Sequence, residues 1–155
     1  MHKPPPPGWP QLAPGLHYQR PAQAIDWLCA AFGFEVRLKV EGEPGDIVHS
    51  ELTYGQALIM VGREGRPGDE ADKPFKLTDT SPASLEGRQT QSLMMYVDDA
   101  DAHCAQARAH GARIVSEPAT HDYGDDYWAD RSYGALDCEG HVWWFSHRVR
   151  TGGAG

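Results

Sequence analysis

The sequence predicts an α+β fold built from two βαβββ modules, whose strands form a rolled mixed sheet (a cup) with the helices outside. Two observations predict it. Each half of the chain has the same order of patterns, namely a strand, an amphipathic helix and three further strands. Matching residues also recur at a constant separation between the halves: Tyr18, Ala22, Ala24 and Gly33 with Tyr96, Ala100, Ala102 and Gly111.

Length and charge exclude several classes of protein. The 155 residues suit one domain with a proper core. The net charge is −8, from 22 acidic and 14 basic side chains, and no basic stripe is present, so we expect no nucleic-acid partner. No apolar run approaches the roughly 20 residues that a membrane span needs, so we expect no membrane partner. The three cysteines are widely spaced, which argues against a disulfide framework and favours the cytoplasm.

The first module is expected within residues 11–62, after a flexible proline-rich arm at residues 1–10 on which the docking of Trp9 stays open. Its helix begins near Pro21, which suits a first turn, and ends at Gly33, which suits a C-terminal cap. Apolar residues at three- and four-residue steps give this helix one buried face. The predicted strands are residues 11–18, 34–41, 47–54 and 56–62.

Residues 63–90 form a long connection between the modules, because they are rich in Gly, Pro, Asp, Glu, Ser and Thr. A loop of this length is usually a linker or functional. Its few large apolar residues include Phe75 and Leu77, which we expect to pack onto the body of the domain.

The second module is expected within residues 91–148, before a disordered tail at residues 149–155. Asp98 or Asp99 caps a helix over residues 100–110. Strands are predicted at residues 92–97 and 113–117, with a loop at residues 118–128. Two further strands then flank a tight turn, because Asp137 and Gly140 supply turn chemistry and residues 141–147 are rich in Val, Trp and Phe. All of residues 11–148 are thus expected to form a single domain.

The sequence resembles the vicinal oxygen chelate superfamily, which includes glyoxalase I, extradiol dioxygenases and bleomycin-resistance proteins. The resemblance covers about residues 12–148 and is strongest to a bacterial, PhnB-like glyoxalase-like branch. It rests on four segments, Ala24-Ile-Asp-Trp-Leu-Cys-Ala-Ala-Phe-Gly-Phe-Glu35, Tyr96-Val-Asp-Asp99, Gly111-Ala-Arg113 and Asp137-Cys-Glu-Gly-His-Val-Trp-Trp-Phe145. The last segment has Cys138 where the family usually has proline. These motifs identify a fold that hosts several chemistries.

The resemblance implies a divalent metal in the cup, held by His, Glu or Gln from the first and last strands of each module. The matching positions here are Ala13, Ser92, Trp144 and either Ile59 or Met60. None of these side chains is a good ligand for a hard divalent ion. We therefore expect no metal and no other cofactor.

A displaced site is the alternative. His49 and Glu51 share one face of a strand, and with His17 they would supply three metal ligands. The interpretation favoured for His49 and Glu51 is a solvated strand face. We expect His141 in the turn, and His103 on the outer helix, to be exposed.

The expected pocket lining is mainly apolar, with an aromatic platform and a few hydrogen-bonding groups: His17, Ser92, Met94, Tyr96, Trp128, Arg131 and Trp144. Such a wall suits a small, flat or partly apolar organic ligand. Arg131 could pair with an anionic group of that ligand or with a nearby acid of the chain, and we favour the acid. Two functions remain open. One is a metal-free protein that binds a small molecule; the other is a lyase, isomerase or dioxygenase-type enzyme with a displaced metal, or with an acid–base site drawing on His17 and Tyr96. The catalytic residues are unknown at this stage, and the resemblance implies a homodimer.

Overall fold

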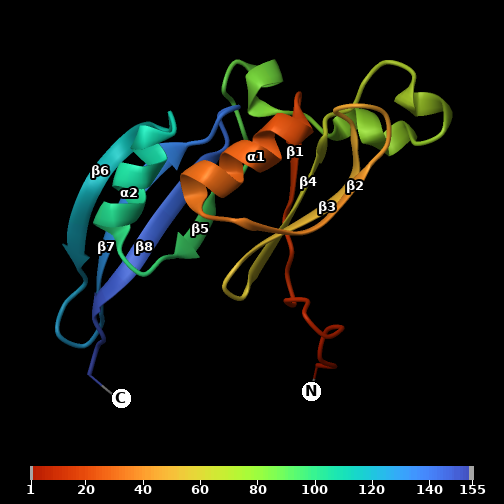
Figure 1. The fold of residues 1–155 in the computed structure, drawn as a ribbon. Coiled ribbons are helices and arrows are strands. Elements are labelled where there is room, and N and C mark those ends of the chain that lie inside the picture. Colours follow the sequence, from red (N-terminus) through yellow and green to blue (C-terminus); the bar gives the residue numbers. More distant parts are fainter. Residues whose placement is uncertain (1, 154–155) are drawn as a thin grey trace. The chain divides into compact units, whose positions relative to one another are not determined.

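A computed structural model describes residues 2–153 and divides the chain into two compact units, one ending at Arg88 and the other beginning at Gln89. Each unit contains one α-helix and one four-stranded mixed sheet (Figure 1). The predicted α+β class and the two βαβββ modules are therefore confirmed.

The first unit follows the order predicted for it. Its elements are β1 (Gly15–Tyr18), α1 (Pro21–Phe32), β2 (Glu35–Glu41), β3 (Ile47–Tyr54) and β4 (Ala57–Arg63). The strand order in the sheet is β1-β4-β3-β2. The β1–β4 pair is parallel, whereas β2–β3 and β3–β4 are antiparallel. The parallel pair requires the crossover that α1 provides.

Helix α1 begins and ends where its sequence predicts. Pro21 occupies the first turn, and Gly33 caps the C-terminus with φ 76°, a left-handed conformation that glycine adopts without strain. The amide of Gly33 donates to the carbonyl of Cys29 at 3.1 Å. The inner face of the helix packs against the sheet to form the core of this unit. The helix contributes Ala24, Ile25, Leu28, Ala31 and Phe32, and the strands contribute Leu16, Tyr18, Leu52, Ile59 and Val61.

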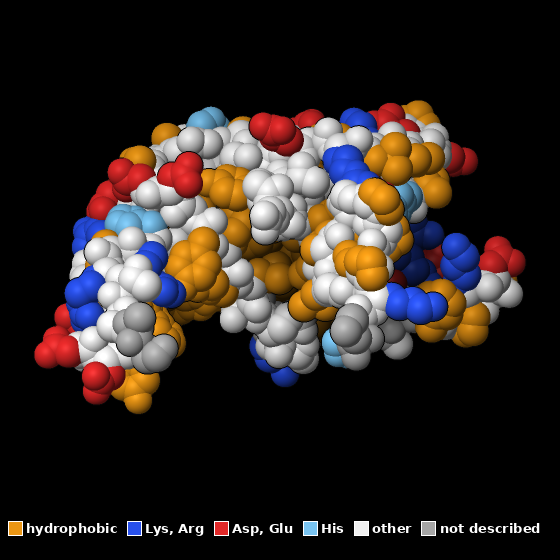
Figure 2. Space-filling view, turned by 90° about the horizontal axis from the view of Figure 1, so that it is seen from below, with side chains coloured by type: hydrophobic (Ala, Val, Ile, Leu, Met, Phe, Trp, Pro, Cys, Tyr) orange, Lys and Arg blue, Asp and Glu red, His pale blue; other side chains and the backbone are white. Residues whose placement is uncertain are grey.

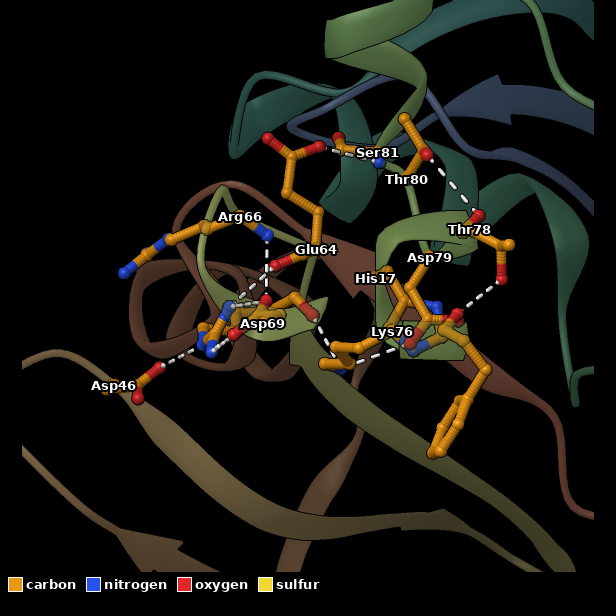
Figure 3. Close-up of polar contacts among 12 residues, drawn as sticks. His17, Asp46, Glu64, Arg66, Asp69, Lys76, Thr78, Asp79, Thr80 and Ser81 are labelled. Atoms are coloured by element: carbon orange, nitrogen blue, oxygen red, sulfur yellow. Dashed lines mark hydrogen bonds and ion pairs between the residues drawn. The ribbon is translucent and has the colours of Figure 1, made fainter. Parts of the chain in front are cut away.

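The connection after β4 carries three short 3₁₀ helices, η1 (Asp69–Ala71), η2 (Pro74–Thr78) and η3 (Pro82–Leu85). The expectation that Phe75 and Leu77 pack onto the body is wrong, because these side chains are 68% and 46% exposed. Polar contacts secure the segment instead (Figure 3). Arg63 of β4 donates to both carboxylate oxygens of Asp69, at 2.6 and 2.7 Å.

The second unit contains β5 (Leu93–Tyr96), α2 (Ala100–Ala109), β6 (Arg113–Asp122), β7 (Ala129–Leu136) and β8 (Val142–Arg150). The strand order is β5-β8-β7-β6, with β5–β8 parallel and the other pairs antiparallel. Strand β6 extends through Pro118 into the predicted loop. The extension is possible because β6 is an edge strand, where proline is tolerated, and its pairing shifts register on either side of Ser116.

Helix α2 packs on one face of this sheet. Asp99, one of the two predicted caps, accepts hydrogen bonds from the amides of Asp101 and Ala102 at 2.9 and 3.1 Å. The prediction that His103 is exposed is wrong. Its ring is 4.4 Å from that of Phe145, and its Nδ1 lies 2.5 Å from the hydroxyl of Tyr133, so it belongs to the core.

The turn between β7 and β8 is organised by the buried carboxylate of Asp137. Its Oδ1 accepts from the amides of Glu139 and His141, both at 3.0 Å, and its Oδ2 accepts from the indole Nε1 of Trp143 at 3.1 Å. The prediction that His141 is exposed is wrong. The residue is buried, and its backbone amide donates a hydrogen bond to this buried carboxylate.

The N-terminal arm contacts the first unit. The guanidinium of Arg37 lies 5.5 Å from the ring centroid of Trp9, and it donates a hydrogen bond to the carbonyl of Gly8. Strand β8 extends to Arg150, and residues 151–153 have no regular structure. The rest of the predicted tail, residues 154–155, and the first residue of the predicted arm lie outside the described residues. No helix in residues 2–153 is both long and apolar enough to cross a membrane.

Candidate functional site: an exposed aromatic face

The face of the second sheet that α2 does not cover is the candidate site. Trp143 and Phe145 are almost completely buried beside α2. Successive side chains of a strand point to opposite faces, so Trp144, Ser146 and Arg148 share the other face. The parallel register places Met94 of β5 beside Trp144, and Tyr96 beside Ser146.

Four large side chains on and beside this face remain exposed to solvent. The exposed fractions are 53% for Met94, 47% for Tyr96, 41% for Trp128 and 38% for Trp144. Hydrophobic side chains are visible at the surface in the space-filling view (Figure 2). We call these four residues the aromatic face. Several large apolar side chains exposed on one face of a sheet mark a binding site more often than an isolated apolar residue does.

The indole of Trp144 lies flat across the neighbouring strand. Gly134 of β7 pairs with Trp144 in register, and a Cβ built on Gly134 would be 3.1 Å from two atoms of the indole ring. The absence of a side chain at residue 134 therefore makes room for the indole. Local sequence thus fixes the orientation of the largest ring on the aromatic face.

Arg148 contacts two rings of this face. Its guanidinium carbon is 5.4 Å from the ring centroid of Tyr96 and 5.1 Å from that of Trp128. Distances of this size give favourable cation–π attraction. The rings therefore hold the guanidinium in one place, which lowers the conformational entropy lost when the group binds a ligand.

Asp130 supports Arg148 from β7. Its side chain is 9% exposed and accepts a hydrogen bond from Nε of Arg148. The hydroxyl of Tyr96 lies 3.2 Å from Oδ2 of Asp130 and also accepts from Nη2 of Arg148. The hydrogen bond to Asp130 raises the pKa of Arg148 above its usual value, so the guanidinium stays charged at all ordinary pH values.

A pair of serine hydroxyls lies between these groups. Ser132 and Ser146 are paired in register, and their oxygens are 2.7 Å apart. One hydroxyl donates to the other, so the two are engaged with each other. The face therefore combines aromatic rings, a fixed cation and hydroxyl groups.

The structure brings together four of the seven residues expected to line a pocket: Met94, Tyr96, Trp128 and Trp144. Ser92 directly precedes β5. Arg131 lies on the α2 side of the sheet, away from the aromatic face, and donates to Asp101 at 2.5 and 2.7 Å, so it pairs with an acid of the same chain. Its position one residue from Asp130 along the strand turns it to the opposite face.

Sequence reasoning missed Asp130 and Arg148. The predicted alternation of Val142, Trp144 and Ser146 needed only one more step to reach Arg148. The sequence predicted the second strand only as far as His147, where the run of aromatic and β-branched residues ends. Register across the β7–β8 pair then assigns Asp130 as the partner of Arg148.

His17, the seventh predicted residue, belongs to the first unit. Its Nε2 is 3.4 Å from Oδ2 of Asp79, which is also 3.2 Å from Nζ of Lys76 (Figure 3). Lys76 in turn donates to the carbonyl of Arg63 at 3.0 Å. Asp79, Lys76 and Arg63 border a polar cavity of about 420 Å³, in which the charged side chains are paired mainly with one another. The contacts secure the connection after β4.

His49 and Glu51 form a separate polar pair on β3. Nε2 of His49 is 3.0 Å from Oε1 of Glu51, and Nε of Arg37 is 3.1 Å from Oε2. Glu51 is buried, so its face of the strand is not simply solvated as expected. Leu52, the residue after Glu51 in β3, points into the core, so His49 and Glu51 point to the opposite face of the sheet.

Comparison with known proteins identifies the family. Residues 14–145 match the Glyoxalase/Bleomycin resistance protein/Dioxygenase superfamily. The chain belongs to this superfamily. The fold agrees with that membership: TioX from Micromonospora sp. ML1, whose crystal structure is known, is 29% identical, with a TM-score of 0.61, covering 94% of this chain and 98% of that one.

Further similar proteins come from structure and from sequence comparison. A family enzyme from Burkholderia phytofirmans PsJN has a TM-score of 0.59 at 16% identity, covering 87% of this chain and 95% of that one. An uncharacterized protein of Mycobacterium tuberculosis is 28% identical over 141 residues, which are 91% of this chain and 76% of the relative. A counterpart in Mycobacterium bovis is also 28% identical, over 85% of its own length.

The resemblance implies metal-ligand positions at Ala13, Ser92, Trp144 and either Ile59 or Met60. In residues 2–153 there is no group of three or more His, Cys, Asp or Glu side chains arranged to hold a metal ion. Ile59 is buried and pairs with Leu52 in the core, and Trp144 lies across Gly134. The residues at these positions supply no oxygen or nitrogen ligand beyond the hydroxyl of Ser92.

Proposed function

We propose that this superfamily member binds a small, flat, partly apolar organic molecule on the aromatic face. The exposure of Met94, Tyr96, Trp128 and Trp144 on one side of the sheet carries the proposal. Stacking on an aromatic side chain contributes about 1 kcal/mol beyond the burial of apolar area. Trp144 is held flat against Gly134 and so offers a ring whose orientation is set before the ligand arrives.

The proposal includes binding without a metal ion or other cofactor. It rests on the side chains at the family's ligand positions, which are alanine, serine, tryptophan and either isoleucine or methionine. The indole of Trp144 occupies one ligand position and offers no oxygen, sulfur or basic nitrogen atom that could coordinate a metal ion. Apolar contact and hydrogen bonding would then supply the affinity.

Equilibrium dialysis with 2-methylnaphthalene, a flat neutral probe, tests the proposal. The wild-type protein should bind the probe, and Trp144→Ala should weaken binding by about fivefold, because one stacking contact of about 1 kcal/mol is lost. Trp9→Ala in the N-terminal arm is the matched control and should leave the affinity unchanged. EDTA should have no effect. Binding that disappears with EDTA, or that survives unchanged in Trp144→Ala, would overturn the proposal.

An enzyme of the same superfamily is the second candidate, and one observation favours it. Glu51 is buried and contacts both His49 and Arg37, an arrangement suited to acid–base chemistry or to a displaced site. Glu51→Gln tests this idea, since it keeps the shape of the side chain and removes the base. Loss of turnover of a glyoxalase-type substrate in that variant, with probe binding retained, would favour the enzyme.

We also propose a homodimer in the cytoplasm, without nucleic-acid partners. The dimer follows from family resemblance, and the net charge of −8 argues against nucleic acid. Light scattering at micromolar concentration should give twice the mass of the chain. A monomer under those conditions would contradict the proposed dimer. A mobility shift with duplex DNA would contradict the proposed absence of a nucleic-acid partner.

A further inference from the structure

We propose that the ligand carries an anionic hydrogen-bond acceptor, such as a carboxylate, which Arg148 binds while the rest of the ligand stacks on the aromatic face. The inference rests on the proposed function and specifies the class of ligand, namely a planar aromatic acid. It follows from which polar atoms of the face are already engaged and which remain available.

Arg148 has donors to spare. Nε and Nη2 donate to Asp130 and to the hydroxyl of Tyr96. Within residues 2–153, Nη1 of Arg148 has no hydrogen-bond partner. A guanidinium has five N–H donors in a planar fork, so its Nη1 side can bind an incoming oxygen.

Asp130, by contrast, has little to offer a ligand. Its side chain is nine-tenths buried, and both of its oxygens are engaged, Oδ1 by Arg148 and Oδ2 by Tyr96. A cationic ligand could not pair with this carboxylate, because both of its oxygens are already bonded, and it would be repelled by the positive charge of Arg148. The face thus presents donors to a ligand, and it favours an acceptor over a cation.

The two rings position the guanidinium for this role. The guanidinium carbon of Arg148 lies over both rings, 5.4 Å from the centroid of Tyr96 and 5.1 Å from that of Trp128. An unrestrained arginine side chain loses conformational entropy when it binds a ligand. Arg148 loses less, because the two rings and the Asp130 carboxylate already restrict its conformation. On the same face, the half-buried Ser132 is hydrogen-bonded to the buried Ser146, so these hydroxyls are engaged with each other.

Three naphthalene probes of the same ring size test the inference: 2-naphthoate, 2-methylnaphthalene and 2-naphthylmethylammonium. We expect the wild-type protein to bind the carboxylate about tenfold more tightly than the neutral probe, as one charge-assisted hydrogen bond commonly contributes. The ammonium probe should bind no better than the neutral one. Raising the salt concentration should reduce the preference for naphthoate, because the contact is partly exposed.

Arg148→Gln should abolish the preference for 2-naphthoate over 2-methylnaphthalene, whatever the absolute affinity for the neutral probe. The matched control is Arg108→Gln, which also removes one positive charge but acts on an exposed pair with Glu117. It should retain the tenfold preference. Arg148→Lys keeps the charge without the fork, and should retain part of the preference even if the Gln variant proves too unstable to measure.

The outcomes separate the two proposals. If no naphthalene probe binds, the proposed function fails. If the neutral and anionic probes bind equally, or Arg148→Gln and Arg108→Gln lose the preference to the same extent, the aromatic face stands and the acid specificity is overturned. Tighter binding of the ammonium probe than of naphthoate would also overturn it.

Discussion

The indole of Trp144 lies so close to Gly134 that a single methyl group at residue 134 would stand 3.1 Å from two of its ring atoms. The two residues are register partners in β8 and β7. Such contacts are shorter than ordinary van der Waals separations, so one partner must yield when the methyl group is present. Because Trp144 is partly exposed, the ring is the partner free to move.

Gly134→Ala should therefore tilt the indole away from the sheet while leaving the fold intact. We expect a loss of about 1 kcal/mol in the free energy of unfolding, at the lower end of the range for overpacking. Naphthalene probes should bind several-fold more weakly, because their stacking surface is displaced. Near-UV circular dichroism and equilibrium dialysis measure the two effects.

Gly15→Ala is the control for that experiment. Gly15 is also a strand glycine, but a Cβ there would meet nothing within 4 Å. This variant should keep the wild-type near-UV spectrum. Equal changes in the two variants would show that glycine in a strand, and not the contact with Trp144, is responsible.

The Asp137 carboxylate is predicted to be a major contributor to the stability of the second unit. Asp137→Ala removes the acceptor of two backbone amides and of the buried indole N–H of Trp143. Leaving a buried donor without a partner is costly, so we expect a loss of about 3 kcal/mol in the free energy of unfolding. Urea denaturation, followed by tryptophan fluorescence, measures it.

Asp125→Ala, in an exposed part of the loop after β6, is the matched comparison. Its effect should stay within about 0.5 kcal/mol, as surface substitutions usually do. A similar cost at both positions would contradict the role assigned to Asp137.

The ion pair between Arg63 and Asp69 should make the stability of the first unit depend on pH. The hydrogen bond from Arg63 holds the pKa of Asp69 far below its ordinary value of 3.8. A depressed pKa means that the folded state binds the proton less readily than the unfolded state. The stabilisation is therefore present above about pH 4 and is lost as pH falls below it.

Asp69→Asn tests this dependence through the melting temperature. The variant should melt below the wild type at pH 7, and the difference should shrink as pH falls from 4 toward 2. Asp72→Asn, an exposed neighbour, should match the wild type throughout. A gap that stayed constant down to pH 2 would mean that the carboxylate charge is not what secures the segment.

Much of the fold could be predicted from the sequence because its signals are local. Pro21 and Gly33 mark the ends of α1, and Asp99 marks the start of α2. His103 and His141 were harder to place. Histidine suits either a surface or a core, and partners distant along the chain decide between them, as Tyr133 does for His103.

The candidate site was predicted only in part, for a similar reason. Alternation along β5 and β8 is enough to group Tyr96 with Trp144 on one face. The association of Arg148 with Asp130 depends on the pairing of two strands, and the sequence alone does not give that register. Arg131 was expected either to bind a ligand or to pair with a nearby acid, and only the structure identifies that acid as Asp101 of α2.

The most direct test of the aromatic face uses the indole N–H signals of the five tryptophans, Trp9, Trp27, Trp128, Trp143 and Trp144, in a ¹H–¹⁵N correlation spectrum. Single Trp→Phe variants assign the signals. On titration with 2-naphthoate, those of Trp128 and Trp144 should shift, while the signal of Trp143, whose N–H is bonded to Asp137, should stay in place. A titration that moves Trp9 or Trp27 and leaves Trp128 and Trp144 unchanged would contradict the account.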